Sequence, residues 1–199
     1  MEDHIFFDSK NIQLEGMINQ PLTDKGVVIT HPHPQYGGDM YNHVVKLITD
    51  IFHDKKYTTL RFNFRGVGNS QGAYDNGKAE QQDVISAINY LSGIGIKQID
   101  LAGYSFGAWI NALVAGSNPV IKRTLMVSPP VAFVDFSPVA LIKSLKLVVT
   151  GTNDDFAPVE LINKSVQVWN PAARIQIIAG ADHFYSTHMP ELESALDGF

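Results

Sequence analysis

The sequence predicts an α/β fold: a doubly wound, mainly parallel sheet in a single domain spanning residues 1–199. Three observations support this fold class. Short, continuously apolar runs alternate with longer segments in which apolar residues recur at helical spacing. The connections are short, as expected for strand-helix-strand units that cover both faces of a sheet. A chain of 199 residues can also build one sizeable core, because proteins of this size bury about 70% of their unfolded surface.

The expected elements follow one another in a regular order. Alternating apolar and polar residues at 4–8 and 11–19 predict an antiparallel hairpin at one edge of the sheet. Continuous apolar runs predict further strands at 26–30, 57–62, 98–102, 121–127, 145–150 and 174–179. Helical spacing predicts helices at 40–54, 78–91, 106–116 and 190–196, and a short helix that begins near Pro158.

Composition excludes several classes of function. A net charge of −5 gives no electrostatic reason to expect nucleic acid or an anionic membrane as a partner. The absence of cysteine excludes disulfides and a thiol nucleophile, and it is compatible with a reducing cytoplasm. No apolar run has the length of a signal peptide core or a membrane span. We therefore expect a soluble, unprocessed, cytoplasmic protein.

A serine lies at the junction between a predicted strand and a predicted helix, in the sequence GYSFG at 103–107. This G-x-S-x-G pattern is typical of a nucleophile elbow, a strained turn that lifts the serine hydroxyl clear of the sheet. Side chains two positions before and after the serine would collide in such a turn, and both positions are glycine here. A chance pair of glycines around a surface serine is the alternative. The flanking strand and helix patterns favour the elbow, with Ser105 as nucleophile.

Other polar side chains follow other predicted strands. His31 and His33 follow the first strand after the hairpin, Asp154 follows the strand at 145–150, and His183 follows the last strand. Because ligands bind beyond the carboxyl ends of the strands in such sheets, we expect these residues near the serine. A serine hydroxyl needs a hydrogen-bonded base, and that base needs an acid that fixes its tautomer. Asp154 and His183 can supply these two roles.

Five sequence motifs, which follow one another along the chain in the expected order, resemble those of the α/β-hydrolase superfamily. GYSFG, the G-x-x-D-x-x-x-P run at 151–158 and the G-x-D-H run at 180–183 are similar to its serine, acid and histidine segments. HPHPQYGG and RFNFRGVGNSQG resemble small, cap-less bacterial hydrolases grouped with carboxylesterases and dienelactone hydrolases. The resemblance covers nearly the whole chain from about Gly26. It implies an α/β-hydrolase fold without a cap domain, with Ser105 as nucleophile, Asp154 as acid and His183 as general base.

Alternatives to the acid and the base are present nearby. Asp155 competes with Asp154, but the spacing from the start of the 151–158 run favours Asp154. His188 is a weaker base because it lies farther past the end of the last strand, in the loop that leads to the last helix. Asp182 is expected to fix its own loop by bonding the backbone.

Acyl transfer also requires two backbone N–H donors for the developing oxyanion. Phe106, the residue after the nucleophile, supplies the first. For the second we predict Gln35, with Tyr36 as the alternative, because the two prolines of this loop have no N–H. The resemblance points the same way, since His33-Pro34 stands where many relatives have His-Gly.

Other motifs favour structural roles over a metal or nucleotide site. The two histidines at 31 and 33 have no carboxylate-rich shell, so we expect no metal, and we read His31 as a loop residue that bonds a backbone carbonyl. The loops at 66–71 and 72–79 miss the dinucleotide and P-loop patterns at one position each. Arg65 is expected to brace the site, and Asp83 to be a solvated or arginine-paired surface residue.

The candidate substrate-binding residues are aromatic: Tyr36, Phe133, Phe136 and Phe156. Lipases and many esterases insert a helical cap in the segment corresponding to 128–143, which has no room for one here. We therefore expect a shallow, open site that favours small or accessible acyl groups.

These observations favour a carboxylesterase that cleaves a small-molecule ester through an acyl-enzyme, as a monomer or homodimer and without a cofactor. Thioesterase, lactonase, amidase or peptidase activity would use the same residues. A non-catalytic binding protein with the same fold is the alternative from another class, and the intact serine, acid and histidine set argues against it.

Overall fold

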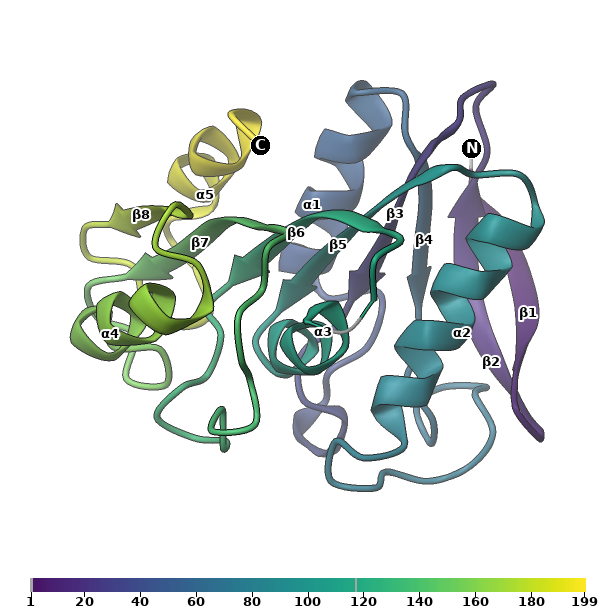
Figure 1. The fold of residues 1–199 in the computed structure, drawn as a ribbon, viewed down its shortest axis with the longest axis horizontal. Coiled ribbons are helices and arrows are strands. Elements are labelled where there is room, and N and C mark those ends of the chain that lie inside the picture. Colours follow the sequence, from purple (N-terminus) through teal and green to yellow (C-terminus); the bar gives the residue numbers. More distant parts are fainter. Residues whose placement is uncertain (1, 117) are drawn as a thin grey trace.

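The computed structural model describes residues 2–116 and 118–199. Its described residues form one eight-stranded sheet flanked by α-helices (Figure 1). The strands are β1 (Asp3–Ser9), β2 (Ile12–Asn19), β3 (Lys25–Thr30), β4 (Thr58–Phe62), β5 (Gln98–Tyr104), β6 (Ile121–Val127), β7 (Leu145–Gly151) and β8 (Arg174–Ile178). The helices are α1 (His43–Asp54), α2 (Glu80–Gly93), α3 (Phe106–Ala115), α4 (Val159–Trp169) and α5 (Met189–Asp197), with one 3₁₀ turn, η1 (Pro34–Tyr36).

The strand order is β1-β2-β4-β3-β5-β6-β7-β8. β1 pairs with β2, and β2 with β4, in antiparallel register, whereas every other neighbouring pair is parallel. The predicted fold class, with its N-terminal antiparallel hairpin, is confirmed. The parallel strands deliver their carboxyl ends to one edge, so the loops after β3, β5, β7 and β8 are placed to share a site.

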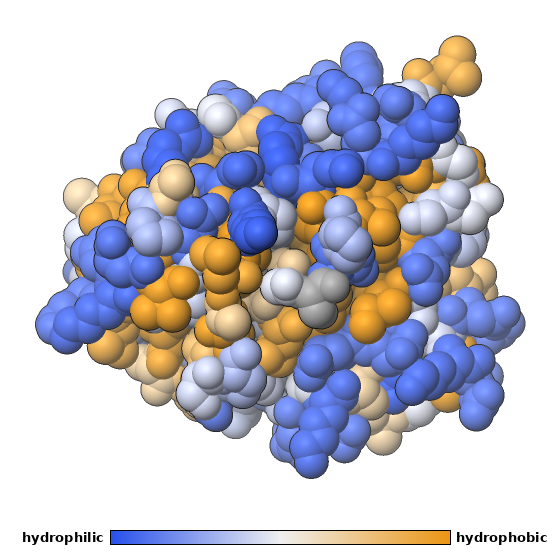
Figure 2. Space-filling model, in the orientation of Figure 1, coloured by the Kyte–Doolittle hydropathy of each residue, from blue (hydrophilic) through white to orange (hydrophobic). Residues whose placement is uncertain are grey.

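Alternate residues of the strands pack on opposite faces of the sheet, which explains their continuously apolar sequences. On β3, for example, Val28 belongs to the core cluster that α2, α3 and α4 cover, whereas Val27 and Ile29 belong to the cluster under α1 and α5. Figure 1 shows these two groups of helices in front of and behind the sheet. On the face of the molecule that Figure 2 shows, exposed apolar side chains gather in the middle and polar ones dominate the upper edge.

Two helices begin later than predicted, for local reasons. The Asn42 side chain accepts the Val44 N–H at 2.9 Å and caps α1, so that helix starts at His43. Residues 76–79 form a turn in which Asn76 and Gly77 have φ angles of 53° and 83°, and α2 starts after it, at Glu80. The predicted loop after β3 contains the short η1 turn, which begins at a proline.

Two buried carboxylates fix the loop that follows β4. Asp83 accepts hydrogen bonds from the Arg65 guanidinium at 2.6 Å and the Ser9 hydroxyl at 2.8 Å. It is completely buried, so the prediction of an arginine pair is confirmed but that of a surface position is wrong. Burial raises the pKa of Glu15, but hydrogen bonds from Asn69, His4 and Asn63 outweigh it and lower that pKa to about 2.

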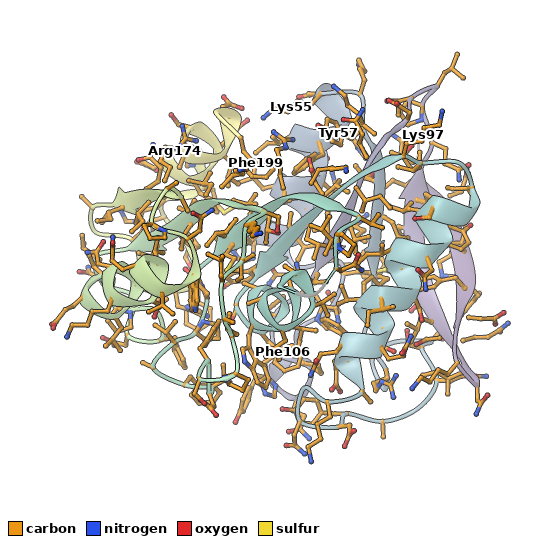
Figure 3. All side chains as sticks on the ribbon, in the orientation of Figure 1. Lys55, Tyr57, Lys97, Phe106, Arg174 and Phe199 are labelled. Atoms are coloured by element: carbon orange, nitrogen blue, oxygen red, sulfur yellow. The ribbon has the colours of Figure 1, made fainter. Side chains whose placement is uncertain are left out.

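Phe199 is fixed near the end of the parallel strands opposite to that of Phe106. Lys55 Nζ donates to the Phe199 carbonyl oxygen at 3.2 Å, and the Arg123 guanidinium lies 4.3 Å from the Phe199 ring centroid. Figure 3 shows Lys55, Tyr57 and Phe199 together at one end of the view and Phe106 at the other.

Two further observations bear on function. Within the described part of the chain, every helix is too short or too polar to cross a lipid bilayer. The segment 129–143 between β6 and β7 contains turns but neither helix nor strand, so the position where a cap would be inserted carries only a loop.

Candidate active site

Ser105 occupies a strained turn between β5 and α3, with φ 54° and ψ −120°. A positive φ is unfavourable for any residue with a Cβ, and strain of this kind is often found at active sites. A Cβ at Gly103 would lie 2.7 Å from the Ala108 nitrogen, and one at Gly107 would lie 2.6 Å from the Thr30 carbonyl oxygen. Neither position could carry a side chain without moving the backbone. The turn therefore has the geometry predicted from GYSFG.

One hydrogen-bond chain joins the three polar residues that the sequence singled out. Ser105 Oγ lies 2.8 Å from His183 Nε2, and His183 Nδ1 lies 2.9 Å from Asp154 Oδ1 and 3.0 Å from Oδ2. All three side chains are buried. The serine comes from the end of β5, the carboxylate follows β7 and the histidine follows β8. The sheet thus brings together residues that are far apart in the sequence.

The carboxylate of Asp154, at the end of this hydrogen-bond chain, is held in its ionised form. Burial raises the pKa of Asp154, but hydrogen bonds from His183, Ser128 and the Ala157 amide outweigh burial, so the pKa lies below its ordinary value. Asp154 Oδ1 accepts the Phe156 and Ala157 N–H groups at 3.0 and 2.8 Å. An ionised carboxylate in this place can fix the histidine tautomer and stabilise a positive charge on the ring.

The loops that carry the carboxylate and the histidine interlock. The Asn153 N–H donates to the Ala181 carbonyl at 2.9 Å, and the Gly180 N–H donates to Thr152 Oγ1 at 2.8 Å. A Cβ at Gly151 would collide with that same Ala181 carbonyl, so the close approach of the two loops requires a glycine there. The glycine that opens the 151–158 motif therefore has a steric reason.

The structure also shows which carboxylate and which histidine form the bonded pair. Asp154 bonds the His183 ring, and the ring of His188 instead bonds Thr187 Oγ1 at 3.0 Å. Asp182 Oδ1 accepts the Phe184 N–H at 3.1 Å, which is the loop-fixing contact expected for it.

The sequence analysis missed three residues that lie near the hydrogen-bond chain of Ser105, His183 and Asp154. The Tyr104 hydroxyl donates to the His183 carbonyl at 2.8 Å, and the Tyr185 hydroxyl lies 2.7 Å from Ser128 Oγ, which in turn bonds Asp154. Burial raises the pKa of both tyrosines, so both hydroxyls stay protonated and can donate. The sequence holds only a weak indication that Ser128 belongs to the site. It directly follows a strand, as the other site residues do, but it stands at the start of a proline-containing loop, before Pro129.

His31 is buried, and its ring bonds the backbone instead of joining the hydrogen-bond chain of Ser105. Its Nδ1 donates to the Pro32 carbonyl at 2.6 Å and its Nε2 accepts the Phe64 N–H at 3.0 Å, which fixes the neutral tautomer. Burial lowers the pKa of His31 to about 4. This is the loop-packing role expected for it. Among the residues that the structure describes, no group of three or more His, Cys, Asp or Glu side chains could hold a metal ion.

The two amides predicted as the second oxyanion donor are both engaged inside the loop after β3. The Gln35 N–H donates to His33 Nδ1 at 3.2 Å, and the Tyr36 N–H donates to the His33 carbonyl at 3.1 Å. The loop closes on itself as the η1 turn, a fold-back that counting prolines could not reveal, and this bond disfavours Gln35 as the second donor. In the described part of the chain, the N–H groups of Phe106 and His33 have no recorded acceptor.

A cavity of about 520 Å³ opens beside the serine hydroxyl. Its described lining is rich in aromatic rings and contains no Lys, Arg, Asp or Glu: Pro32, His33, Tyr36, Gly37, Gly38, Asn42, Tyr104, Ser105, Phe106, Pro130, Phe133, Val134, Phe156, His183 and Phe184. Of the four predicted substrate-binding residues, Tyr36, Phe133 and Phe156 line it. Phe136 does not, because its ring packs on Trp169 with the centroids 5.0 Å apart.

Comparisons with known proteins identify relatives of this chain. A model of the dienelactone hydrolase family matches residues 38–195. The uncharacterized protein RP471 of Rickettsia prowazekii (strain Madrid E) is 34% identical over 207 residues, which cover 98% of this chain and 87% of that protein.

Solved structures of bacterial hydrolases superpose closely on the chain. An alpha-beta serine hydrolase homologue from Coxiella burnetii has a TM-score of 0.91 at 34% identity, with 98% of this chain and 96% of that one covered. XC6422 from Xanthomonas campestris, described as an α/β serine hydrolase without lid, has a TM-score of 0.91 at 24% identity, with coverage of 99% and 92%.

Proposed function

Because the chain belongs to the dienelactone hydrolase family, within the α/β-hydrolases, we propose that it is a serine hydrolase that cleaves carboxylic esters through an acyl-enzyme. The observation that carries this proposal is the hydrogen-bond chain from Ser105 Oγ through His183 to Asp154, with distances of 2.8 and 2.9 Å. It opens onto a cavity of about 520 Å³ that can hold a small ester. A serine bonded to a histidine that is itself oriented by an ionised carboxylate is the arrangement that activates a hydroxyl nucleophile.

In the first half of the reaction, Ser105 Oγ attacks the ester carbonyl carbon. A new C–O bond forms, the carbonyl electron pair moves onto its oxygen, and the serine proton moves to His183 Nε2. Asp154 stabilises the resulting imidazolium by charge and does not itself take up the proton. When the intermediate collapses, the bond to the leaving alkoxide breaks and His183 returns the proton to it, leaving an acyl-serine and a free alcohol.

In the second half, water takes the place of the alcohol. His183 accepts a proton from water as the water oxygen attacks the acyl carbon, and it then protonates Ser105 Oγ as that oxygen leaves. The products are a carboxylic acid and the regenerated enzyme. No redox step or cofactor is needed to balance this sequence.

The developing oxyanion would be held by the N–H groups of Phe106 and His33. The Phe106 N–H is at the amino-terminal end of α3, where helix dipole and orphan donors favour negative charge. The His33 N–H belongs to the loop after β3, which lines the same cavity. Hydrogen-bond donors that are fixed before the reaction stabilise the transition state without reorganisation.

Thioesters, lactones and amides would react through the same residues, and esters are the favoured substrate because the carboxylesterase resemblance covers the loops after β3 and β4 as well as the three motif segments. A non-catalytic role is disfavoured because the serine, histidine and carboxylate keep a productive geometry that folding alone does not require.

Labelling with a fluorophosphonate probe tests the proposal, since such probes phosphonylate only an activated serine. We expect wild-type protein to be labelled at Ser105 and Ser105→Ala to remain unlabelled. Ser92→Ala, which changes an exposed serine near the end of α2, is the matched control and should label like wild type. A folded wild-type protein that fails to react with the probe and to hydrolyse small esters would rule the proposal out.

A further inference from the structure

We propose that the cavity selects uncharged esters that carry an aromatic ring. The inference rests on the proposed function, because the ester would react at the same Ser105. It adds a substrate class, which follows from the charge, ring arrangement and exposure of the cavity wall.

The wall offers nothing that would pair with an ionised substrate. No Lys, Arg, Asp or Glu belongs to the described lining, and the polar groups present are the reacting hydroxyl, two imidazoles, two phenols and the Asn42 amide. Burial lowers the pKa of His33, so its ring stays neutral near pH 7 and supplies no positive charge. An anionic group placed here would lose its hydration without gaining a counter-ion.

Aromatic side chains form a continuous wall that begins at the proposed general base. The Phe156 ring centroid lies 4.7 Å from that of His183, and the Phe133 centroid lies 5.5 Å from that of Phe156. Tyr36 continues the wall with its centroid 6.2 Å from that of Phe133. The Phe184 ring also borders the histidine, with its centroid 5.6 Å from that of His183.

The outer rings of this wall are unusually exposed for apolar side chains. The exposed fractions are 74% for Tyr36, 49% for Phe133 and 54% for Phe184. Single exposed apolar residues are normal on a protein surface, but a contiguous group beside a cavity is typical of a ligand site. A bound apolar group would cover these rings and remove them from water.

A planar ring suits this wall better than a saturated one of similar size. Neighbouring rings in the wall meet at steep angles, 71° between Phe133 and Phe156 and 64° between Tyr36 and Phe133, so both ring edges and ring faces border the space. Edge-to-face and offset contacts add stabilisation beyond buried area, equivalent to about 2- to 10-fold in affinity. The volume of about 520 Å³ is also far larger than an acetyl group needs.

Matched ester pairs test this inference. Methyl 3-phenylpropanoate and methyl 3-cyclohexylpropanoate differ only in ring saturation on the acyl side, and 2-phenylethyl acetate and 2-cyclohexylethyl acetate differ likewise on the alcohol side. In at least one pair we expect kcat/KM to be about 2- to 10-fold higher for the phenyl ester. A 4-carboxyphenyl analogue of the preferred ester should react at least about 10-fold more slowly than its uncharged parent.

Substitutions at the wall should lower the phenyl-to-cyclohexyl ratio of kcat/KM, a quantity that cancels a general loss of activity. We expect Phe133→Leu to bring the ratio towards one. Tyr36→Leu, at a more exposed position that tolerates change, serves if the first variant does not fold. Phe6→Leu on β1, where the aromatic ring is 46% exposed but outside the cavity, is the matched control and should keep the wild-type ratio.

The outcomes separate this inference from the proposed function. Equal or inverted ratios in both pairs, with fluorophosphonate labelling and methyl acetate hydrolysis intact, would overturn the aromatic preference alone. A carboxylate analogue that reacts as fast as its parent would do the same for the charge selection. Loss of both labelling and acetate hydrolysis in folded wild-type protein would overturn the proposed function instead.

Discussion

His31 and His183 are both buried, both follow a strand of the same sheet, and both use their two ring nitrogens in hydrogen bonds. Their partners differ. His31 lies between a backbone carbonyl and a backbone N–H, at 2.6 and 3.0 Å, whereas His183 lies between a carboxylate and a serine hydroxyl, at 2.9 and 2.8 Å. A backbone N–H can only donate, so protonation of His31 would break one bond, but a carboxylate stabilises a protonated His183. The partners, and not the burial, decide which histidine can move a proton.

The sharpest test of this contrast removes each ring in turn. His183→Ala should lower kcat for ester hydrolysis by about 10⁶-fold, because the nucleophile loses its base. The free energy of unfolding of this variant should change little. His31→Ala should instead act mainly on folding, by about 1–3 kcal/mol, since it leaves the Phe64 N–H buried without an acceptor. Steady-state kinetics and urea unfolding of both variants would measure these effects, and similar kinetic losses in the two would break the contrast.

The second test changes the partner and keeps the ring. Asp154→Asn should lower kcat by about 10⁴-fold, because an amide no longer fixes the productive tautomer or stabilises the imidazolium. Asp155→Asn, at the neighbouring exposed carboxylate, is the matched control and should have little effect. If Asp155→Asn proved the more damaging of the two in ester hydrolysis assays, the assignment of the acid would be wrong.

The third test uses pH and concerns His31. Its pKa in the folded protein is about 4, against an ordinary value of 6.5, so between these values the unfolded chain binds a proton that the folded protein does not. Stability should therefore fall as pH falls through this window, by about 2 kcal/mol between pH 7 and pH 5 from this group. Urea unfolding of wild type and His31→Gln at both pH values isolates the contribution. An equal loss in the two proteins would show that His31 does not cause it.

The smallest expected effect concerns the backbone that carries His183. Tyr104→Phe removes the hydroxyl that donates to the His183 carbonyl at 2.8 Å but keeps the ring. We expect kcat to fall about 3- to 10-fold, with KM within about 2-fold of wild type, because a less firmly held base is less often in position. Pre-steady-state acylation rates would show the loss directly. A change confined to KM would assign Tyr104 to substrate binding.

The sequence was sufficient for those features that depend on local patterns. Strands buried on both faces read as continuous apolar runs, and their ends located Ser105, Asp154 and His183 without any knowledge of pairing. Features that depend on distant partners, or on the exact conformation of a loop, were not accessible. The burial of Asp83 requires Ser9 from the N-terminal hairpin, and the engagement of the Gln35 amide requires the His33 ring to fold back over its own loop.

The wall of the cavity draws on the loops that carry the proton-transfer residues, through Phe156 and Phe184, and on one stretch that carries none of them. The segment 129–143 between β6 and β7 supplies Phe133 to the rim and none of the three residues of the proposed triad. Part of this loop must be preserved, because Val139 and Ile142 are buried in the core and the Ala132 N–H donates to the Phe156 carbonyl at 3.0 Å, whereas Phe133 is exposed. New substrate preferences are therefore best sought in libraries confined to the exposed residues around Phe133, which leave the core residues of the loop and the proposed triad unchanged.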